Sequence, residues 1–211
     1  MFTRPGSHAV LLPVKSPGSA KSRLSMLGDT ERAVLAAAFA RDVVDVCLET
    51  AGVAGVLVVS DDIAFATSLT DRGAESCADP GGGLNAALRA AAAVLHERRP
   101  DLRPVAVCAD LPALAPSDLT TALAEASGSA GPSFVRDADG TGTTLYTAAY
   151  DDFDPRFGPG SADAHLRAGA RPVAGALPTL RRDVDDADSL AAAIELGVGA
   201  CTAAALRAIA V

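Results

Sequence analysis

Val56-Leu57-Val58-Val59 is an unbroken apolar run that ends at the polar residues Ser60-Asp61-Asp62. A second run, Val105-Ala106-Val107-Cys108, ends in a similar way shortly before Asp110. Runs that are apolar at every position are typical of strands buried on both faces, as in parallel sheets covered by helices. The two runs therefore predict central strands of an α/β sheet.

Helical patterns alternate with these strands. Further strands are expected over residues 8–14 and 75–78, and helices over 31–50, 63–72 and 84–98 and from Pro116 onward. This repeated order predicts a mostly parallel α/β sheet. After Gly128 we expect strands over 133–136 and 143–150 and helices over 162–168, 188–196 and 200–209. No linker interrupts the chain, which predicts one domain over 1–211.

Composition narrows the class of ligand. The chain has 211 residues, 49% of them hydrophobic, and a net charge of -8. An acidic surface opposes nucleic-acid binding, so we expect no nucleic-acid partner. No apolar stretch approaches the ~18 residues of a membrane span, and the four cysteines form no C-x-x-C pair. We therefore expect a cytoplasmic protein without a membrane partner, a disulfide or a zinc site.

Both lysines of the chain, Lys15 and Lys21, lie with Arg23 in the loop after the first predicted strand, whereas the other basic residues are all arginines. Compact ammonium groups serve well as point charges on polyphosphate oxygens. A solvated surface loop is the alternative interpretation of the same cluster. Against an acidic background, the phosphate interpretation indicates a small anionic ligand.

Three acidic residues are candidate metal ligands. Asp110 follows a buried strand, at the end of the sheet where α/β proteins bind ligands. Asp183 and Asp185 would share one side of an extended segment, with Val184 facing the core. Such carboxylates suit Mg²⁺. An ordinary turn residue at 110 and a solvated acidic cluster at 183–185 are the alternatives.

Small residues form two loops in the second half, Gly140-Thr141-Gly142-Thr143 and Gly158-Pro159-Gly160-Ser161. Their backbone N–H groups and hydroxyls could hold a phosphate or carboxylate, or they could be plain turns. Asn85, near a helix start, could contact a base or ribose edge. Neither a dinucleotide fingerprint nor Walker A spacing is present.

Five of these segments, taken in order, resemble one family. They are Leu12–Lys15 with Ala20–Leu24, Asp110–Leu114, Gly140–Thr143, Arg156–Ser161 and Asp183–Asp185. Together they are similar to the 2-phospho-L-lactate/phosphoenolpyruvate guanylyltransferases of coenzyme F420 biosynthesis, over nearly the whole chain from about Val10. One departure is Ala109, where glycine is expected before the aspartate.

The resemblance implies a nucleotide-diphospho-sugar-transferase-like, Rossmann-like fold with a central mixed sheet flanked by helices. Residues 8–127 would form the nucleotide-binding half, and residues 128–211 the half that binds the acceptor and completes the metal site. By the resemblance, the residues that contact GTP would be Lys15, Lys21, Arg23, Asn85 and Asp110, and all of these except Asn85 would also be catalytic. The Mg²⁺ ligands would be Asp110, Asp183 and Asp185. The acceptor would be bound by Thr143, Gly158 and Ser161.

The implied reaction transfers GMP from GTP to a phosphorylated three-carbon acid, with release of pyrophosphate. The Ala-rich composition with Arg in place of Lys is typical of an actinobacterial source. In the resembling family that lineage is associated with phosphoenolpyruvate, so the resemblance implies this acceptor, with 2-phospho-L-lactate or 3-phosphoglycerate as alternatives. Another nucleotidylyltransferase of this fold, acting on a sugar phosphate or molybdopterin, and a non-catalytic nucleotide-binding domain remain further alternatives. The protein is expected to be a monomer or a homodimer.

Overall fold

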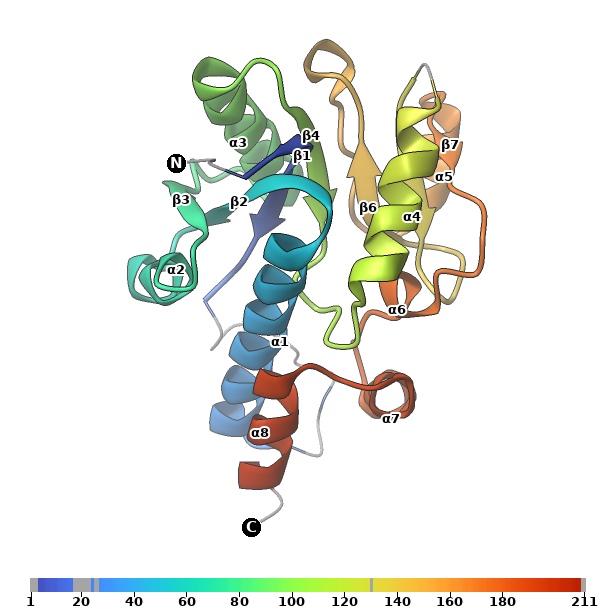
Figure 1. Ribbon diagram of the computed structural model, residues 1–211. Helices are drawn as coiled ribbons and strands as arrows, with labels where there is room; N and C mark the ends of the chain where they lie inside the picture. The colour runs from blue at the N-terminus through green and yellow to red at the C-terminus, as the bar shows by residue number, and fades with distance from the viewer. Residues whose placement is uncertain (1–3, 17–23, 25–26, 130, 210–211) are drawn as a thin grey trace.

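A computed structural model describes residues 4–16, 24, 27–129 and 131–209. Its centre is a seven-stranded sheet in the order β3-β2-β1-β4-β6-β5-β7 (Figure 1). The strands are β1 (Gly6–Pro13), β2 (Gly52–Ser60), β3 (Glu75–Ala78), β4 (Arg103–Val107), β5 (Ser133–Arg136), β6 (Thr143–Thr147) and β7 (Arg171–Pro172). All neighbours pair in parallel except β4 with β6 and β5 with β6. The predicted mixed, mostly parallel α/β sheet is therefore confirmed.

Strand β1 shows why the central strands are apolar at every position. Val10 and Leu12 belong to the hydrophobic core on one face of the sheet, whereas Ala9 and Leu11 belong to the core on the other face. All four are fully buried. Because side chains alternate between the faces of a strand, a strand covered on both sides needs apolar residues throughout.

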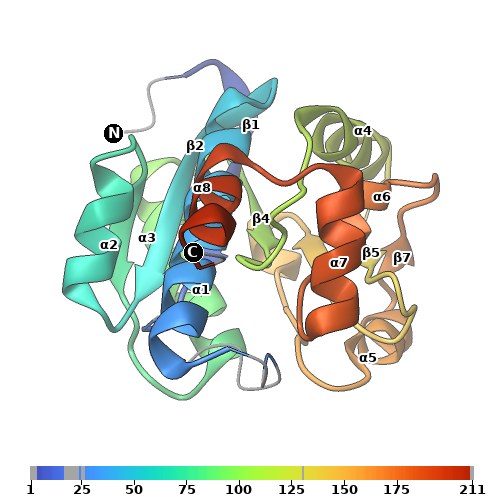
Figure 2. The same cartoon turned by 90° about the horizontal axis from the view of Figure 1, so that it is seen from below.

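Helices cover both faces of the sheet (Figures 1 and 2). Helices α1 (Asp29–Glu49), α2 (Ile63–Thr70), α4 (Pro116–Ser127) and α6 (Pro178–Arg181) supply one core, and α3 (Leu84–Arg98) and α5 (Ser161–Arg167) supply the other. Helices α7 (Ala187–Leu196) and α8 (Ala200–Ile209) form a third core with α1, in which Phe39 and Val184 are fully buried.

The structure departs from the predicted elements in three places. Strand β6 ends at Thr147, and a 3₁₀ turn, η2 (Tyr150–Asp152), replaces the expected end of the strand. Residues 183–185 are a link between α6 and α7 and not a strand, although Val184 does face the core as predicted. Strand β7 and helix α6 are too short to give a hydrophobic period, so the sequence did not predict them.

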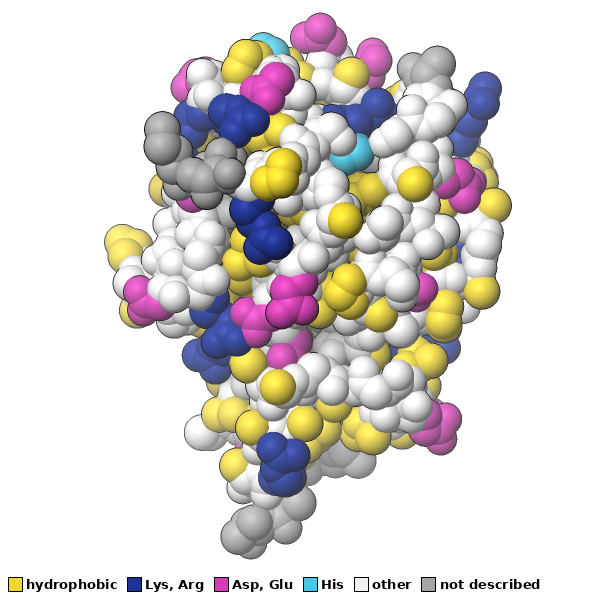
Figure 3. All heavy atoms as spheres, viewed as in Figure 1, with side chains coloured by type: hydrophobic (Ala, Val, Ile, Leu, Met, Phe, Trp, Pro, Cys, Tyr) yellow, Lys and Arg dark blue, Asp and Glu magenta, His cyan; other side chains and the backbone are white. Residues whose placement is uncertain are grey.

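The surface carries mixed charge. On the face shown in Figure 3, Lys and Arg side chains lie singly or beside Asp and Glu side chains and form no continuous basic field among the described residues. The helices in the described ranges are also too short or too polar for any of them to cross a membrane.

We expect the two-sided core to make β1 sensitive to truncation. Leu11→Ala should lower the free energy of unfolding by about 2–5 kcal/mol, because Leu11 is fully buried and a cavity would remain. The matched control is Leu196→Ala at the end of α7, where the side chain is 40% exposed and the loss should stay below about 1 kcal/mol. Urea unfolding measures both variants, and equal losses would contradict this description of the core.

Candidate active site

A cavity of about 380 Å³ opens where β1, β2 and β4 end. In open α/β sheets this carboxyl edge is where ligands bind. Its lining comes from the strand ends, from α1 and α2, and from the start of α3: Pro13, Val14, Lys15, Ala36, Phe39, Ala40, Val59, Phe65, Asp79, Gly83, Leu84, Ala87, Cys108, Ala109 and Asp110. The cavity is therefore largely apolar, with charged groups placed at a few positions.

Two of the predicted site residues share this cavity. Lys15 follows β1 and Asp110 follows β4, and both contribute to the lining. The parallel pairing of β1 with β4 brings the two ends together although they are far apart in the sequence. Ala109, the departure from the family pattern, also lines the cavity. The predictions for Lys21 and Arg23 fall outside the described residues.

Asp183 and Asp185 come to the same end of β4. The Val184 backbone N–H donates a hydrogen bond to the Asp110 carbonyl oxygen at 3.0 Å. Burial and, in decreasing order, the negative charges of Asp110, Asp185 and Asp137 together raise the pKa of the Asp183 carboxyl to about 7. Four carboxyls therefore lie near one another here, and Asp137 is the one that was not among the predicted site residues.

These carboxyls do not form a ready-made ligand cage. Within the part of the chain that the structure describes, one group of three has its potential ligand atoms within 4.8 Å of one another: Asp42, Asp45 and Cys201. That group has a structural explanation. The Asp42 carboxylate accepts the backbone N–H groups of Cys201 and Thr202 at 2.9 and 2.8 Å, and Asp45 forms an ion pair with Arg72.

The predicted acceptor residues lie on β6 and on the loop before α5. Thr143 begins β6 and is 6% exposed, and Ser161 begins α5 and is 2% exposed. Gly158 has a φ of 134°, a conformation that L side chains rarely adopt. The Ser161 N–H donates to the Gly158 carbonyl oxygen at 3.0 Å, which closes this loop.

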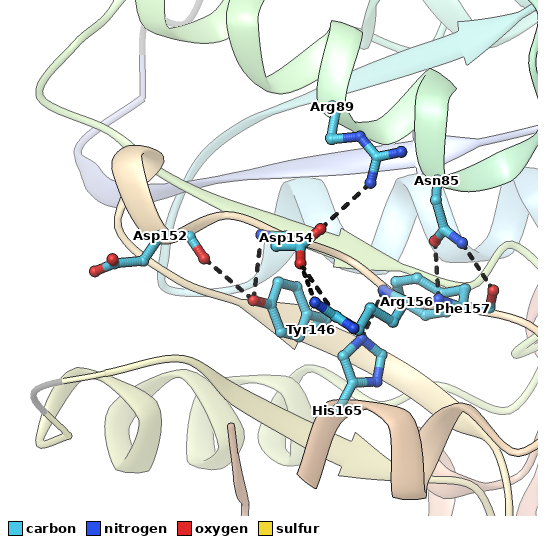
Figure 4. A network of polar contacts seen from close by, with 8 residues as sticks. All are labelled: Asn85, Arg89, Tyr146, Asp152, Asp154, Arg156, Phe157 and His165. Carbon is cyan, nitrogen blue, oxygen red and sulfur yellow. Dashed lines mark hydrogen bonds and ion pairs between the residues drawn. The ribbon is translucent and has the colours of Figure 1, made fainter. Parts of the chain in front are cut away.

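His165 connects the two elements that carry the predicted acceptor residues. Its Nδ1 lies 3.0 Å from the Thr143 hydroxyl. Its Nε2 accepts the Arg156 backbone N–H at 2.9 Å (Figure 4). Burial lowers the pKa of this imidazole to about 4, so it is neutral near pH 7. The spacing of the histidines in the sequence predicted no role for His165. Its position four residues after Ser161, hence on the same helical face, was the available signal.

The side-chain amide of Asn85 is hydrogen-bonded to the backbone of Phe157. Its Nδ2 donates to the Phe157 carbonyl oxygen at 2.9 Å, and its Oδ1 accepts the Phe157 N–H at 2.8 Å (Figure 4). The amide therefore joins the start of α3 to the loop that carries Gly158. Contact of Asn85 with GTP stays a prediction, because the structure shows this amide engaged with the protein's own backbone.

Sequence comparison identifies the family. The family described as guanylyl transferase CofC-like matches residues 8–178. The chain belongs to this family. It is 48% identical to the phosphoenolpyruvate guanylyltransferase of Streptomyces scabiei, over 93% of this chain and 94% of that protein. It is 46% identical to the enzyme of the same name from Thermomonospora curvata, over 93% of this chain and 87% of that protein.

Solved structures support the fold. A Desulfovibrio desulfuricans protein described as a nucleotide-diphospho-sugar transferase superposes with a TM-score of 0.64 at 18% identity, covering 86% of this chain and 84% of that one. A Mycobacterium tuberculosis protein crystallised with manganese superposes with a TM-score of 0.53 at 20% identity, covering 90% and 100%. The predicted fold of the resembling family is thereby confirmed.

The crowding of carboxyls predicts an unusual effect of Asp183→Asn. In EDTA at pH 8 this variant should be more stable than the parent by about 1–2 kcal/mol, because it removes a partly buried charge beside like charges. Asp61→Asn, at an exposed position, is the control and should change stability by less than about 0.5 kcal/mol. A destabilised Asp183→Asn protein in urea unfolding would contradict the prediction.

The lowered pKa of His165 predicts that the free energy of unfolding falls in acid. Between pH 6.5 and about 4 the unfolded chain protonates this histidine while the folded protein keeps it neutral, so stability falls as the pH is lowered. The full effect is roughly 3 kcal/mol. Urea unfolding from pH 7 to 4.5 should show a flatter pH dependence for His165→Gln than for the parent. Parallel curves for the two proteins would refute the assigned shift.

Proposed function

We propose that the protein transfers GMP from GTP to phosphoenolpyruvate and releases pyrophosphate, a reaction that would belong to coenzyme F420 biosynthesis in the cytoplasm. The observation that carries the proposal is the cavity at the carboxyl edge of the sheet, where Lys15 and Asp110 share the lining. Membership of the guanylyl transferase family and the names of the relatives from Streptomyces scabiei and Thermomonospora curvata support it.

The reaction makes one bond and breaks one. A phosphate oxygen of the acid attacks the α-phosphorus of GTP, a phosphoanhydride forms, and the bond to the pyrophosphate oxygen breaks. A phosphate monoester is largely ionised near neutral pH, so no histidine base is required. The residues of the protein act by positioning and by charge. Lys15 would neutralise negative charge on the nucleotide phosphates.

Asp110, Asp183 and Asp185 would hold the Mg²⁺ ion. The Val184 N–H bond to the Asp110 carbonyl oxygen brings these residues together, and a positive charge would relieve the repulsion that, after burial, raises the pKa of Asp183. Hard oxygen donors match the preference of Mg²⁺. When bound, the ion would supply charge stabilisation on the phosphates. Thr143, Gly158 and Ser161 would bind the acid.

The proposal predicts a preference among acceptors. With GTP and Mg²⁺, kcat/KM for phosphoenolpyruvate should exceed that for 2-phospho-L-lactate and 3-phosphoglycerate by roughly tenfold or more, because a site shaped for a flat acid discriminates through transition-state binding. Pyrophosphate release with each acid measures this ratio. Asp110→Asn is the control for catalysis by this site and should lose most activity. A preference for another acid or for a sugar phosphate would contradict the proposal.

A further inference from the structure

We propose that His165 is a positioning residue for the acceptor: it fixes the Thr143 hydroxyl so that this hydroxyl donates its hydrogen to the acid. The inference rests on the proposed function, because it assumes that Thr143 contacts the acceptor. His165 itself would touch neither the nucleotide nor the acid. It would act through Thr143 and through the Arg156–Ser161 loop.

The backbone of Arg156 sets the tautomer of His165. An N–H group can only donate, so the 2.9 Å contact from the Arg156 N–H requires an unprotonated Nε2. A neutral imidazole then carries its proton on Nδ1. The backbone hydrogen bond with Ser161, which raises the pKa of His165, uses this same Nδ1 hydrogen, so the N–H is shared between the Ser161 backbone and Thr143 Oγ1.

This tautomer decides what the Thr143 hydroxyl can do. Nδ1 lies 3.0 Å from Thr143 Oγ1, and a protonated Nδ1 can only donate to it. The hydroxyl accepts that bond, and its own hydrogen must point elsewhere. Within the described ranges no other hydrogen bond of this hydroxyl is seen. An anionic carboxylate or phosphate oxygen is the kind of acceptor that such a prepared donor would bind best.

Aromatic packing keeps the imidazole in this orientation. Its ring stacks on Tyr146 with centroids 4.6 Å apart and on Phe134 at 5.4 Å, and Phe157 meets it edge-on at 5.6 Å. The His165 side chain is fully buried. A flip of the ring would exchange Nδ1 with Cδ2 and Nε2 with Cε1, and both hydrogen bonds of the ring would be lost. Figure 4 shows the ring pointing at the backbone of the Arg156 loop.

Two variants separate the two contacts of His165. The carbonyl of Gln can replace Nε2 and accept the Arg156 N–H, whereas the shorter amide of Asn can replace Nδ1 and donate to Thr143. We expect H165Q and T143V each to lose about tenfold or more in kcat/KM for phosphoenolpyruvate, at unchanged KM for GTP, because a hydrogen bond to a charged group is lost. H165N should stay within about threefold of the parent.

The double variant T143V/H165Q provides the decisive comparison. If His165 acts through Thr143, the double variant should lose no more than T143V alone. Losses that multiply, or an equal loss in H165Q and H165N, would overturn the inference and leave His165 with a role in packing only. An unaltered parent that releases no pyrophosphate with any acid would instead overturn the proposed function.

A measurement on the parent protein tests the tautomer without any substitution. The nitrogen chemical shifts of the His165 side chain should report a neutral ring with the hydrogen on Nδ1 at pH 7. A hydrogen on Nε2 would overturn the inference even if the variants failed to fold.

Discussion

The repulsion between carboxyls at the end of β4 is the constraint on which the rest of the site depends. Asp183 is buried beside Asp110, Asp185 and Asp137, and its burial together with these negative charges raises its pKa to about 7. Such an arrangement persists only if surrounding packing fixes it. Val184 provides this, since its side chain is fully buried beneath α7 and α8 and its N–H is bonded to Asp110. The C-terminal helices thus serve the site without lining its cavity.

The two halves of the chain contribute different parts of the site: the first half provides the apolar cavity, and the second half provides small residues in fixed conformations. The parallel strands β1, β2 and β4 create an apolar cavity at their carboxyl ends, a property of the fold in general. The antiparallel pair β5–β6 and the loop before α5 supply small residues in fixed conformations, such as Gly158. Asn85 joins the halves, because it extends from the start of α3 to the backbone of Phe157.

Sequence reasoning succeeded where the signal is local. The runs at 56–59 and 105–108 are strands because burial on both faces demands apolar residues, and Asp110 lies at the site because it follows such a strand. Asp137 and His165 were missed because their importance depends on partners distant in the sequence. The same holds for Asn85, whose role follows from a contact with Phe157, 72 residues away.

The few aromatic residues of the chain gather around His165. The chain has only six phenylalanines and two tyrosines, and its core is otherwise built from small aliphatic side chains. Yet Phe134, Tyr146 and Phe157 pack around His165, and Phe153 packs on Tyr146. Aromatic rings have few rotatable bonds and stack in defined geometries. Rings gathered at this position hold an imidazole whose two hydrogen bonds require one orientation, which aliphatic packing would fix less firmly.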